Sequence, residues 1–357
     1  MFDPLQPNNK LPLLPTSFNY DQVDILKQVN QANIALANLN IRAERLPNTL
    51  LLVNPLLVRE SVASSGIENI NTTVYAVFEA EISKEKKTGP VKEVLHYKDA
   101  MMEGLKIVEE RGFLSTNDFV RVQSVVEPNK TGVRKLEVKI KNDRTGKILY
   151  TPPVTEQVIR DLLKNLEDFI NNHEDGIDPL VKMAMFHYQF ESIHPFLDGN
   201  GRVGRILMIL YLVMTGRLKF PVLYLSGYIQ DHKNLYYNHL REANISNDYK
   251  NLILYMLKAV EEQSKRTEKS IIKIEKLMDK VEFVIEKKMR VRSKELLDCL
   301  FSRALLTIDY VQDYLKLSSR QTASKYLQTL EELGYFKEKK LGRHKFFYSE
   351  EFVNLLS

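Results

Sequence analysis

Twelve consecutive residues near the middle of the chain carry side chains suited to chemistry: H-P-F-L-D-G-N-G-R-V-G-R, residues 194–205. His194 ends an apolar helical pattern, and an imidazole titrates near neutral pH, so it suits a general base that removes a proton from a hydroxyl. Asp198 offers the hard carboxylate oxygen that Mg²⁺ prefers, with phosphate and water expected to complete the shell. The spacing predicts a base and a metal ligand four residues apart.

The same string predicts a binding site for a polyphosphate. Gly199 and Gly201 flank Asn200 directly before a helix, where free backbone N–H groups and the positive end of the helix dipole attract anions. Arg202 and Arg205 are three residues apart, so both guanidinium groups leave the first helical turn on nearly the same side. Each feature alone has an ordinary structural explanation, but together within twelve residues they indicate phosphate transfer.

The elements that must position this string are mostly helices. The preceding helix is expected to begin with Asp178 as its cap and Pro179 at its first position. Its residues are apolar nearly all round, which is typical of a helix at the centre of a bundle. Other helices are expected at four places: 21–53, broken at Pro47; from just after Pro55; 156–171; and about 202–214.

Two further regions have patterns of their own. Apolar residues alternate between Val133 and Tyr150 around a polar connector, which predicts a β-hairpin. After a charged connector helix, three short helices and two strands are expected in the order of a winged helix-turn-helix. These cover 293–301, 308–315, 319–333, 335–339 and 345–348. We expect a mainly α fold divided into a helical N-terminal segment (1–110), a catalytic core (111–262), a connector helix (263–290) and a winged helix domain (291–357).

The composition limits the class of protein. The chain has 357 residues, 44% of them hydrophobic, which suits two or three domains with a sizeable core. The apolar run at 206–214 is much shorter than the ~20 residues that span a bilayer. The N-terminus lacks the pattern of a secretory signal, so we expect a cytoplasmic protein. Cys299 is the only cysteine, which excludes an intramolecular disulfide and a thiolate zinc site, and a buried thiol is expected.

The string at 194–205 resembles the signature of the Fic family, H-P-F-x-D/E-G-N-G-R-x-x-R, and matches every fixed position. The resemblance covers roughly residues 19–262. It implies a Fic-type helical bundle and an enzyme that transfers AMP from ATP to a Ser, Thr or Tyr hydroxyl of a target protein. By resemblance, His194 is the base, Asp198 holds Mg²⁺, and Arg205 contacts the γ-phosphate. The residues implied in ATP binding here are Asp198, Gly199, Asn200, Gly201, Arg202, Val203, Gly204 and Arg205.

The resemblance also assigns roles outside the signature. The predicted hairpin resembles the family's flap, which pairs with the target segment as an added strand. The flap residues beside the site would be Lys147, Ile148, Leu149 and Tyr150. Three later positions resemble those that line the adenosine end of the nucleotide: Tyr236, Tyr237 and Asn244. For either tyrosine, packing of its helix into the core is an equally good interpretation.

Residues 64–69, S-S-G-I-E-N, fit the inhibitory motif S/T-x-x-x-E-G/N of many family members. In isolation this pattern also resembles an ordinary helix end. The resemblance implies that Glu68 pairs with Arg205 and occupies the space of the γ-phosphate, which leaves the enzyme weakly active. In some relatives this glutamate also aligns a water that removes AMP, so a reverse reaction is a further expectation.

The C-terminal region suggests a second partner. From residue 265 onward the chain has 20 Lys and Arg residues against 14 Asp and Glu, within a formal net charge of +5. The predicted winged helix resembles modules appended to bacterial family members, and its recognition helix would present Arg320, Gln321 and Lys325 to base edges and phosphates. Many winged helices bind only protein, so both partners stay open. A homodimer is common among relatives.

Two other functions remain open at this point. The first keeps the fold and changes the donor or the group that is moved, although intact Gly204 and Arg205 favour a triphosphate donor. The second is a DNA-binding regulator for which nucleotide occupancy is only a signal.

Overall fold

The structure is a computed structural model that describes residues 3–45, 49–82, 87–142, 145–289, 293–341 and 344–356. These residues form fifteen helices and two small antiparallel hairpins, β1–β2 and β3–β4, so the predicted mainly α fold is confirmed. In chain order the elements are α1 (Val23–Glu44), α2 (Thr49–Ile67), α3 (Val74–Ile82), α4 (Gly89–Arg111), α5 (Thr116–Val126), β1 (Ile140–Lys141), β2 (Ile148–Tyr150), α6 (Glu156–Asn171), α7 (Pro179–Ile193), α8 (Asn200–Met214), α9 (Leu225–Asp231), α10 (Lys233–Ser246), α11 (Lys250–Lys288), α12 (Ser293–Phe301), α13 (Ile308–Tyr314), α14 (Arg320–Glu332), β3 (Lys337–Leu341), β4 (His344–Tyr348) and α15 (Glu350–Leu356).

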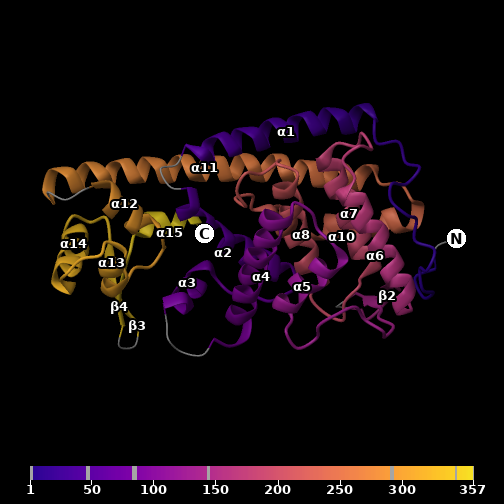
Figure 1. The fold of residues 1–357 in the computed structure, drawn as a ribbon, viewed down its shortest axis with the longest axis horizontal. Coiled ribbons are helices and arrows are strands. Elements are labelled where there is room, and N and C mark those ends of the chain that lie inside the picture. The colour runs from indigo at the N-terminus through magenta and orange to yellow at the C-terminus, as the bar shows by residue number, and fades with distance from the viewer. Residues whose placement is uncertain are drawn as a thin grey trace.

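Two long helices give the molecule its elongated shape. α11 has 39 residues, and α1 packs along it on one long side of the molecule (Figure 1). The small elements α12 to α15 and the hairpin β3–β4 gather at one end of α11, while α6, α7 and the hairpin β1–β2 lie toward the other end. α11 continues without interruption through residue 262, where the sequence suggested that the core ends and a connector begins.

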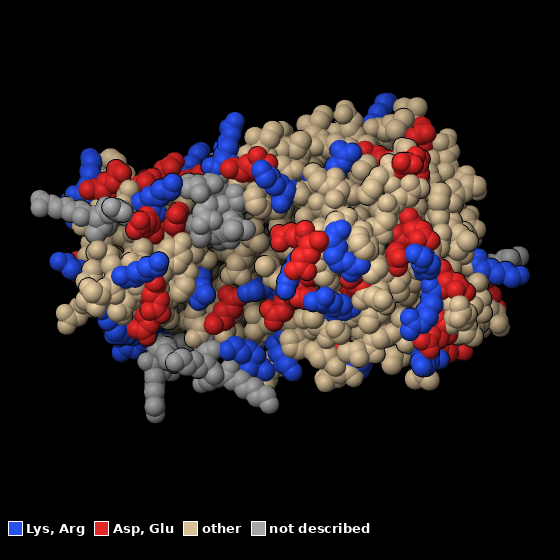
Figure 2. All heavy atoms as spheres, viewed as in Figure 1, with Lys and Arg blue, Asp and Glu red and all other residues tan. Residues whose placement is uncertain are grey.

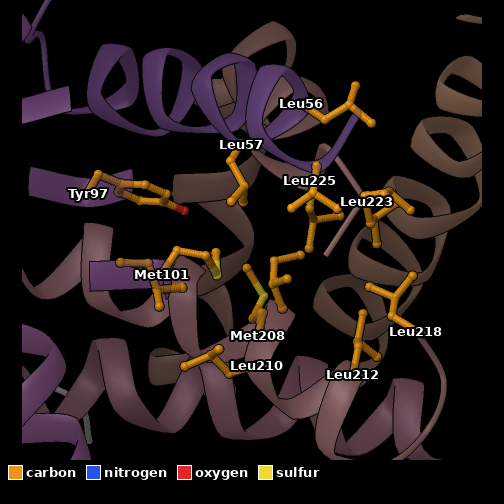
Figure 3. Close-up of a cluster of buried hydrophobic side chains, with 14 of the residues drawn as sticks. Leu56, Leu57, Tyr97, Met101, Met208, Leu210, Leu212, Leu218, Leu223 and Leu225 are labelled. Atoms are coloured by element: carbon orange, nitrogen blue, oxygen red, sulfur yellow. The ribbon is translucent and has the colours of Figure 1, made fainter. Parts of the chain in front are cut away.

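One part of the hydrophobic core lies where α2, α4, α8 and α9 meet (Figure 3). Leu57, Tyr97, Met101, Met208 and Leu225 come from these four helices and are at most 1% exposed. Burying one such side chain contributes ~1.5–3 kcal/mol, so this cluster fixes the four helices against one another. α7 is buried nearly all round, as its apolar pattern predicted. No helix among the described residues is long and apolar enough to cross a membrane.

Most predicted helix limits agree with the structure. α6 has the predicted limits, and α7 begins as predicted, since the Asp178 side chain accepts a hydrogen bond from the N–H of Leu180. One prediction was wrong, because α2 runs through Pro55 instead of starting after it. A proline inside a helix removes one backbone hydrogen bond, but the three apolar residues that follow it are buried and offset that loss. Pro47 lies outside the described residues.

The first hairpin is shorter than the alternation predicted. β1 and β2 pair antiparallel over only two or three residues, and Leu136 is 66% exposed outside them. The chain before β1 bonds instead to the loop after α7: the N–H of Arg134 donates to the carbonyl of Pro195 at 2.9 Å, and Val133 bridges to Phe196. Pairing with that loop takes the place of a longer hairpin. Residues 143–144 of the predicted connector lie outside the described residues.

The C-terminal elements follow the predicted order of three helices and a hairpin. They are followed by α15, which the sequence analysis did not predict and which buries Phe352, Val353 and Leu356. The hairpin reaches the N-terminal part of the chain, because Lys339 of β3 donates to the Tyr75 hydroxyl of α3 at 2.9 Å. Cys299 is buried, as expected, and burial raises the pKa of its thiol to about 12.

Candidate active site

His194 follows the last residue of α7 in the left-handed conformation, with φ 50° and ψ 59°. This backbone turns the chain out of the helix, and residues other than glycine and asparagine rarely adopt it. Nδ1 of His194 is buried, so Nε2 is the nitrogen available for proton transfer. Burial, and after it the positive charge of Arg134, lower the pKa of His194 to about 4. The imidazole is therefore neutral at pH 7 and able to accept a proton.

The loop between His194 and α8 is braced from within. The Asn200 side chain accepts from the N–H of Phe196 and donates to its carbonyl, both at 2.9 Å. Gly199 has φ 82°, and a Cβ there would also lie 3.2 Å from side-chain atoms of Val126 and Glu127. The loop geometry therefore requires glycine at 199, and it places the buried Asn200 amide within the loop rather than in the open site.

Asp198 is the predicted metal ligand, and its side chain is 40% exposed beside the start of α8. It accepts a hydrogen bond from the N–H of Gly199 at 2.8 Å and pairs with Lys130. Burial alone would raise the pKa of Asp198, but the contact with Lys130 outweighs it and the pKa is lowered. Among the described residues no three His, Cys, Asp or Glu side chains form a metal cluster. A single accessible carboxylate fits Mg²⁺ that takes its other ligands from phosphate and water.

The two arginines of the signature have different partners. Arg202 is 3% exposed and donates to Glu93 of α4 at 2.8 Å and to Glu127 after α5. Arg205 is 1% exposed, and it donates from Nε to the Ser64 hydroxyl at 2.7 Å. Glu93 and Glu127 were not predicted, because carboxylates distant from residue 202 in the sequence give no spacing signal. The guanidinium of Arg202 is thus already held by two carboxylates at the edge of the site.

The predicted pair of Glu68 and Arg205 is present. Arg205 Nη2 donates to Glu68 Oε1 at 2.8 Å and to the Ser64 carbonyl at 3.0 Å. Glu68 Oε1 also lies over the start of α8, since a Cβ at Gly201 would be only 2.3 Å from it. The carboxylate therefore lies beside the first turn of α8, close to the N-terminus that the glycines were expected to offer to phosphate.

A second carboxylate, which sequence reasoning missed, lies behind this pair. Oε1 of Glu191 is buried, and a Cβ at Gly204 would come within 2.5 Å of it, so glycine is needed there for close packing. Burial raises the pKa of Glu191 to about 8; Arg205 opposes the shift and Glu68 adds to it. Glu191 lies near the end of the buried helix α7, and only that position could have suggested it. Val203, between the two arginines, is buried in the core.

The three residues expected near the adenosine end of the nucleotide differ in exposure and in their contacts. Tyr236 is 1% exposed and its hydroxyl lies 2.7 Å from His187 Nε2, which agrees with the core-packing interpretation. Tyr237 is 42% exposed. Asn244 Oδ1 accepts from the hydroxyls of Tyr188 at 3.2 Å and Ser192 at 3.3 Å, so it lies against α7.

The four residues of the predicted flap also differ in exposure. Lys147 is exposed, and Ile148 and Leu149 are half-buried. Tyr150 is buried, and its hydroxyl donates to the Ser192 carbonyl at 2.9 Å, close to the end of α7. The hairpin is thereby joined to the helix that carries His194.

Family models match the chain in three consecutive ranges. The model for the Fic/DOC family N-terminal region matches residues 26–106, and the Fic/DOC family model matches residues 113–212. A model for the C-terminal domain of SoFic-like protein adenylyltransferases matches residues 277–352. The chain belongs to the Fic family. The first two ranges contain Glu68 and the complete string at 194–205 of this Fic protein.

Known relatives cover parts of this Fic protein. It is 28% identical over 159 residues to the protein adenylyltransferase fic-1 of Caenorhabditis elegans, a match that covers 44% of this chain and 29% of the relative. It is 45% identical over 69 residues to a probable protein adenylyltransferase of Aquifex aeolicus, which covers 19% of this chain and 21% of the relative. The matches span less than a third of the length of either relative.

Solved structures show the same fold. A Fic family protein from Desulfovibrio desulfuricans is 20% identical with a TM-score of 0.60, and the match covers 97% of this Fic protein and 98% of that chain. Fic-1 of C. elegans is 23% identical with a TM-score of 0.52 over 69% and 72% of the two chains.

Proposed function

We propose that this Fic protein transfers AMP from ATP to a Ser, Thr or Tyr hydroxyl of a target protein, and to itself, with release of pyrophosphate. The observation that carries the proposal is a neutral histidine at the end of α7, followed within six residues by a glycine-rich helix N-terminus. The histidine can accept the proton of a hydroxyl, and the helix N-terminus can bind phosphate oxygens. Relatives that are named protein adenylyltransferases support the same reaction.

The reaction follows from the placement of these groups. Nε2 of His194 takes the proton of the target hydroxyl while that oxygen forms a bond to the α-phosphorus and the bond to the pyrophosphate oxygen breaks. The N–H groups at the start of α8 and the Arg202 guanidinium stabilise the negative charge on the phosphate oxygens. Asp198 would hold Mg²⁺, which supplies positive charge to the phosphates.

We further propose that Glu68 inhibits this reaction. Its carboxylate pairs with Arg205 and lies over Gly201, and it carries the negative charge that a phosphate oxygen would bring to the same arginine. ATP must displace Glu68 before its γ-phosphate can reach Arg205. Removal of AMP from modified targets, with Glu68 orienting a water, is proposed on the resemblance to relatives alone.

The C-terminal elements are proposed to form a winged helix that binds a protein partner. Arg320 of α14 donates to Asp309 at 2.6 Å, so its guanidinium is paired within the module, while Gln321 and Lys325 are exposed. Figure 2 shows positive and negative side chains intermixed over the face that it displays. The homodimer, the cytoplasmic location and the domain limits at 110, 262 and 290 also remain proposals.

The test uses the full chain with Glu68→Gly, Mg²⁺ and ATP labelled at the α-phosphate, beside the same protein that also carries His194→Ala. We expect label on the protein only where His194 is present. Label from γ-labelled ATP alone, or from another nucleotide, would indicate a different donor or transferred group. If no donor labels either protein, self-modification is refuted, and DNA binding by the C-terminal module becomes the function to test by gel shift.

A further inference from the structure

Arg134 joins the end of α7 to both ends of the hairpin β1–β2. The residue is 2% exposed, and its guanidinium donates to four backbone carbonyls. The acceptors are His194 at 2.7 Å, Ile193 at 3.3 Å, Leu136 at 2.9 Å and Pro153 at 2.6 Å. Arginine can do this because it carries five N–H donors in a fixed planar arrangement.

Two of these acceptors are carbonyls at the C-terminus of α7. The last carbonyls of a helix lack partners within the helix, and a positive charge there is favourable. The hydrogen bond to the His194 carbonyl also holds a residue in the left-handed backbone conformation, which is unfavourable for residues other than glycine. The backbone N–H of Arg134 bonds to the Pro195 carbonyl at 2.9 Å. One residue therefore fixes the turn at His194 through its side chain and its backbone.

The other two acceptors belong to the hairpin. Leu136 precedes β1 and Pro153 follows β2, so a single guanidinium holds the two points where the chain enters and leaves the hairpin. A lysine could not reproduce this, because its three donors leave one nitrogen atom and cannot reach four carbonyls spread around a plane.

We propose that Arg134 is a positioning residue that holds His194 and the hairpin β1–β2 in one fixed relation. The proposal rests on the proposed AMP transfer, in which His194 removes the proton of the target hydroxyl, and on the family resemblance, by which the hairpin pairs with the target segment. A general base must lie within about 2.6–3.2 Å of the oxygen that carries the proton, so a small displacement between base and hairpin is costly. None of these four hydrogen bonds of the Arg134 guanidinium involves the residues that hold Glu68 or Arg205.

The positive charge of Arg134 also affects the pKa of His194. After burial, it is the main influence that lowers the pKa of His194, while Glu68 at the end of α2 and Asp198 in the following loop raise it. Loss of Arg134 would leave the two carboxylates as the neighbouring charges, so the imidazole would bind a proton more readily.

The kinetic test uses Arg134→Met and Arg134→Lys in the full chain with Glu68→Gly. For Arg134→Met we expect the maximal rate of self-labelling to fall by about 100-fold, the usual effect of a misplacement of about 1 Å. The KM for ATP should stay within threefold of the parent value. The maximal rate of Arg134→Lys should lie between those of the parent and Arg134→Met. The matched control is Lys135→Met, which removes the same charge from a side chain that is 77% exposed. A maximal rate within threefold of the parent, or an equal fall in the control, would overturn the proposal.

A second measurement does not depend on AMP transfer. In full-length protein with labelled histidines, the His194 resonance is identified by its absence in His194→Ala and followed against pH by NMR. We expect the midpoint to rise above about 4 in Arg134→Met, where burial still holds it below the ordinary value, and to stay near 4 in Arg134→Lys, which keeps the charge. An unchanged midpoint in Arg134→Met would overturn the coupling. A shifted midpoint in a protein that no donor labels would retain the contact between Arg134 and His194 and reject the proposed reaction.

Discussion

Replacing Glu68 tests the inhibitory contact most directly. The hydrogen bond from Arg205 Nη2 to Glu68 Oε1 is charge-assisted at 2.8 Å, a class of contact that contributes ~1.5–3 kcal/mol. Because the Glu68 side chain is 35% exposed, solvent weakens the pair and the lower part of that range, ~1.5–2 kcal/mol, applies. If ATP must break this contact to bind productively, its removal should accelerate self-labelling by roughly 10- to 30-fold, at ~1.4 kcal/mol per factor of ten.

The assay compares initial rates of self-labelling for the parent, Glu68→Gly and Glu68→Gln at subsaturating ATP. Glu68→Gln keeps a hydrogen-bond acceptor near Arg205 but loses the charge, so its rate should lie between the other two. The matched control is Glu110→Gln, since Glu110 is a surface carboxylate whose side chain is 60% exposed and 3.9 Å from Lys106. Rates for Glu68→Gly within threefold of the parent, or an equal increase in the control, would show that the contact does not limit the reaction.

Three further predictions concern the site. Because the pKa of His194 is lowered to about 4, the maximal rate of the Glu68→Gly protein should be nearly constant between pH 6 and 8, and a midpoint near 6.5 in the pH profile would contradict this. Asp198→Asn should raise the Mg²⁺ concentration for half-maximal labelling at least about tenfold. ATP binding without metal, measured by calorimetry, should be unchanged. Equal Mg²⁺ dependence in the parent and the variant would show that Asp198 is not the ligand. The folded-state pKa of Glu191, about 8, lies above its ordinary value, so ionisation of Glu191 destabilises the fold as pH rises from about 4.5 to 8. Glu191→Gln should therefore increase the melting temperature more at pH 8 than at pH 5, and a difference independent of pH would refute this.

The sequence predicted those parts of the site that are contiguous in the chain. His194, Asp198 and the start of α8 lie within a few residues of one another, and local turn and helix signals place them. Glu68 was predicted by resemblance alone, because nothing in the spacing of residues 64–69 indicates a contact 137 positions away. The partners of Arg202 were not predictable, since Glu93 and Glu127 reach it only through the packing of α4 and α5 against α8.

For the fold too, the sequence predicted features that depend on neighbouring residues better than features that depend on tertiary contacts. The limits of α6 and α7 follow from caps and apolar spacing, which act locally. The hairpin was predicted too long because the alternation near Leu136 says nothing about which segment becomes the partner. The partner is instead the loop after α7, which pairs with the chain at Val133 and Arg134, and this pairing depends on tertiary structure.

The uninterrupted helix α11 has a consequence for target choice. Its 39 residues span roughly 58 Å at the usual rise per residue, and α1 lies along it, so the pair behaves as a stiff rod. The C-terminal elements rest on one end of this rod and also touch α2. Anything bound by those elements is consequently held at a set distance from His194. Under the proposed AMP transfer, a partner bound by those elements would favour target hydroxyls that lie at the matching separation from the bound surface.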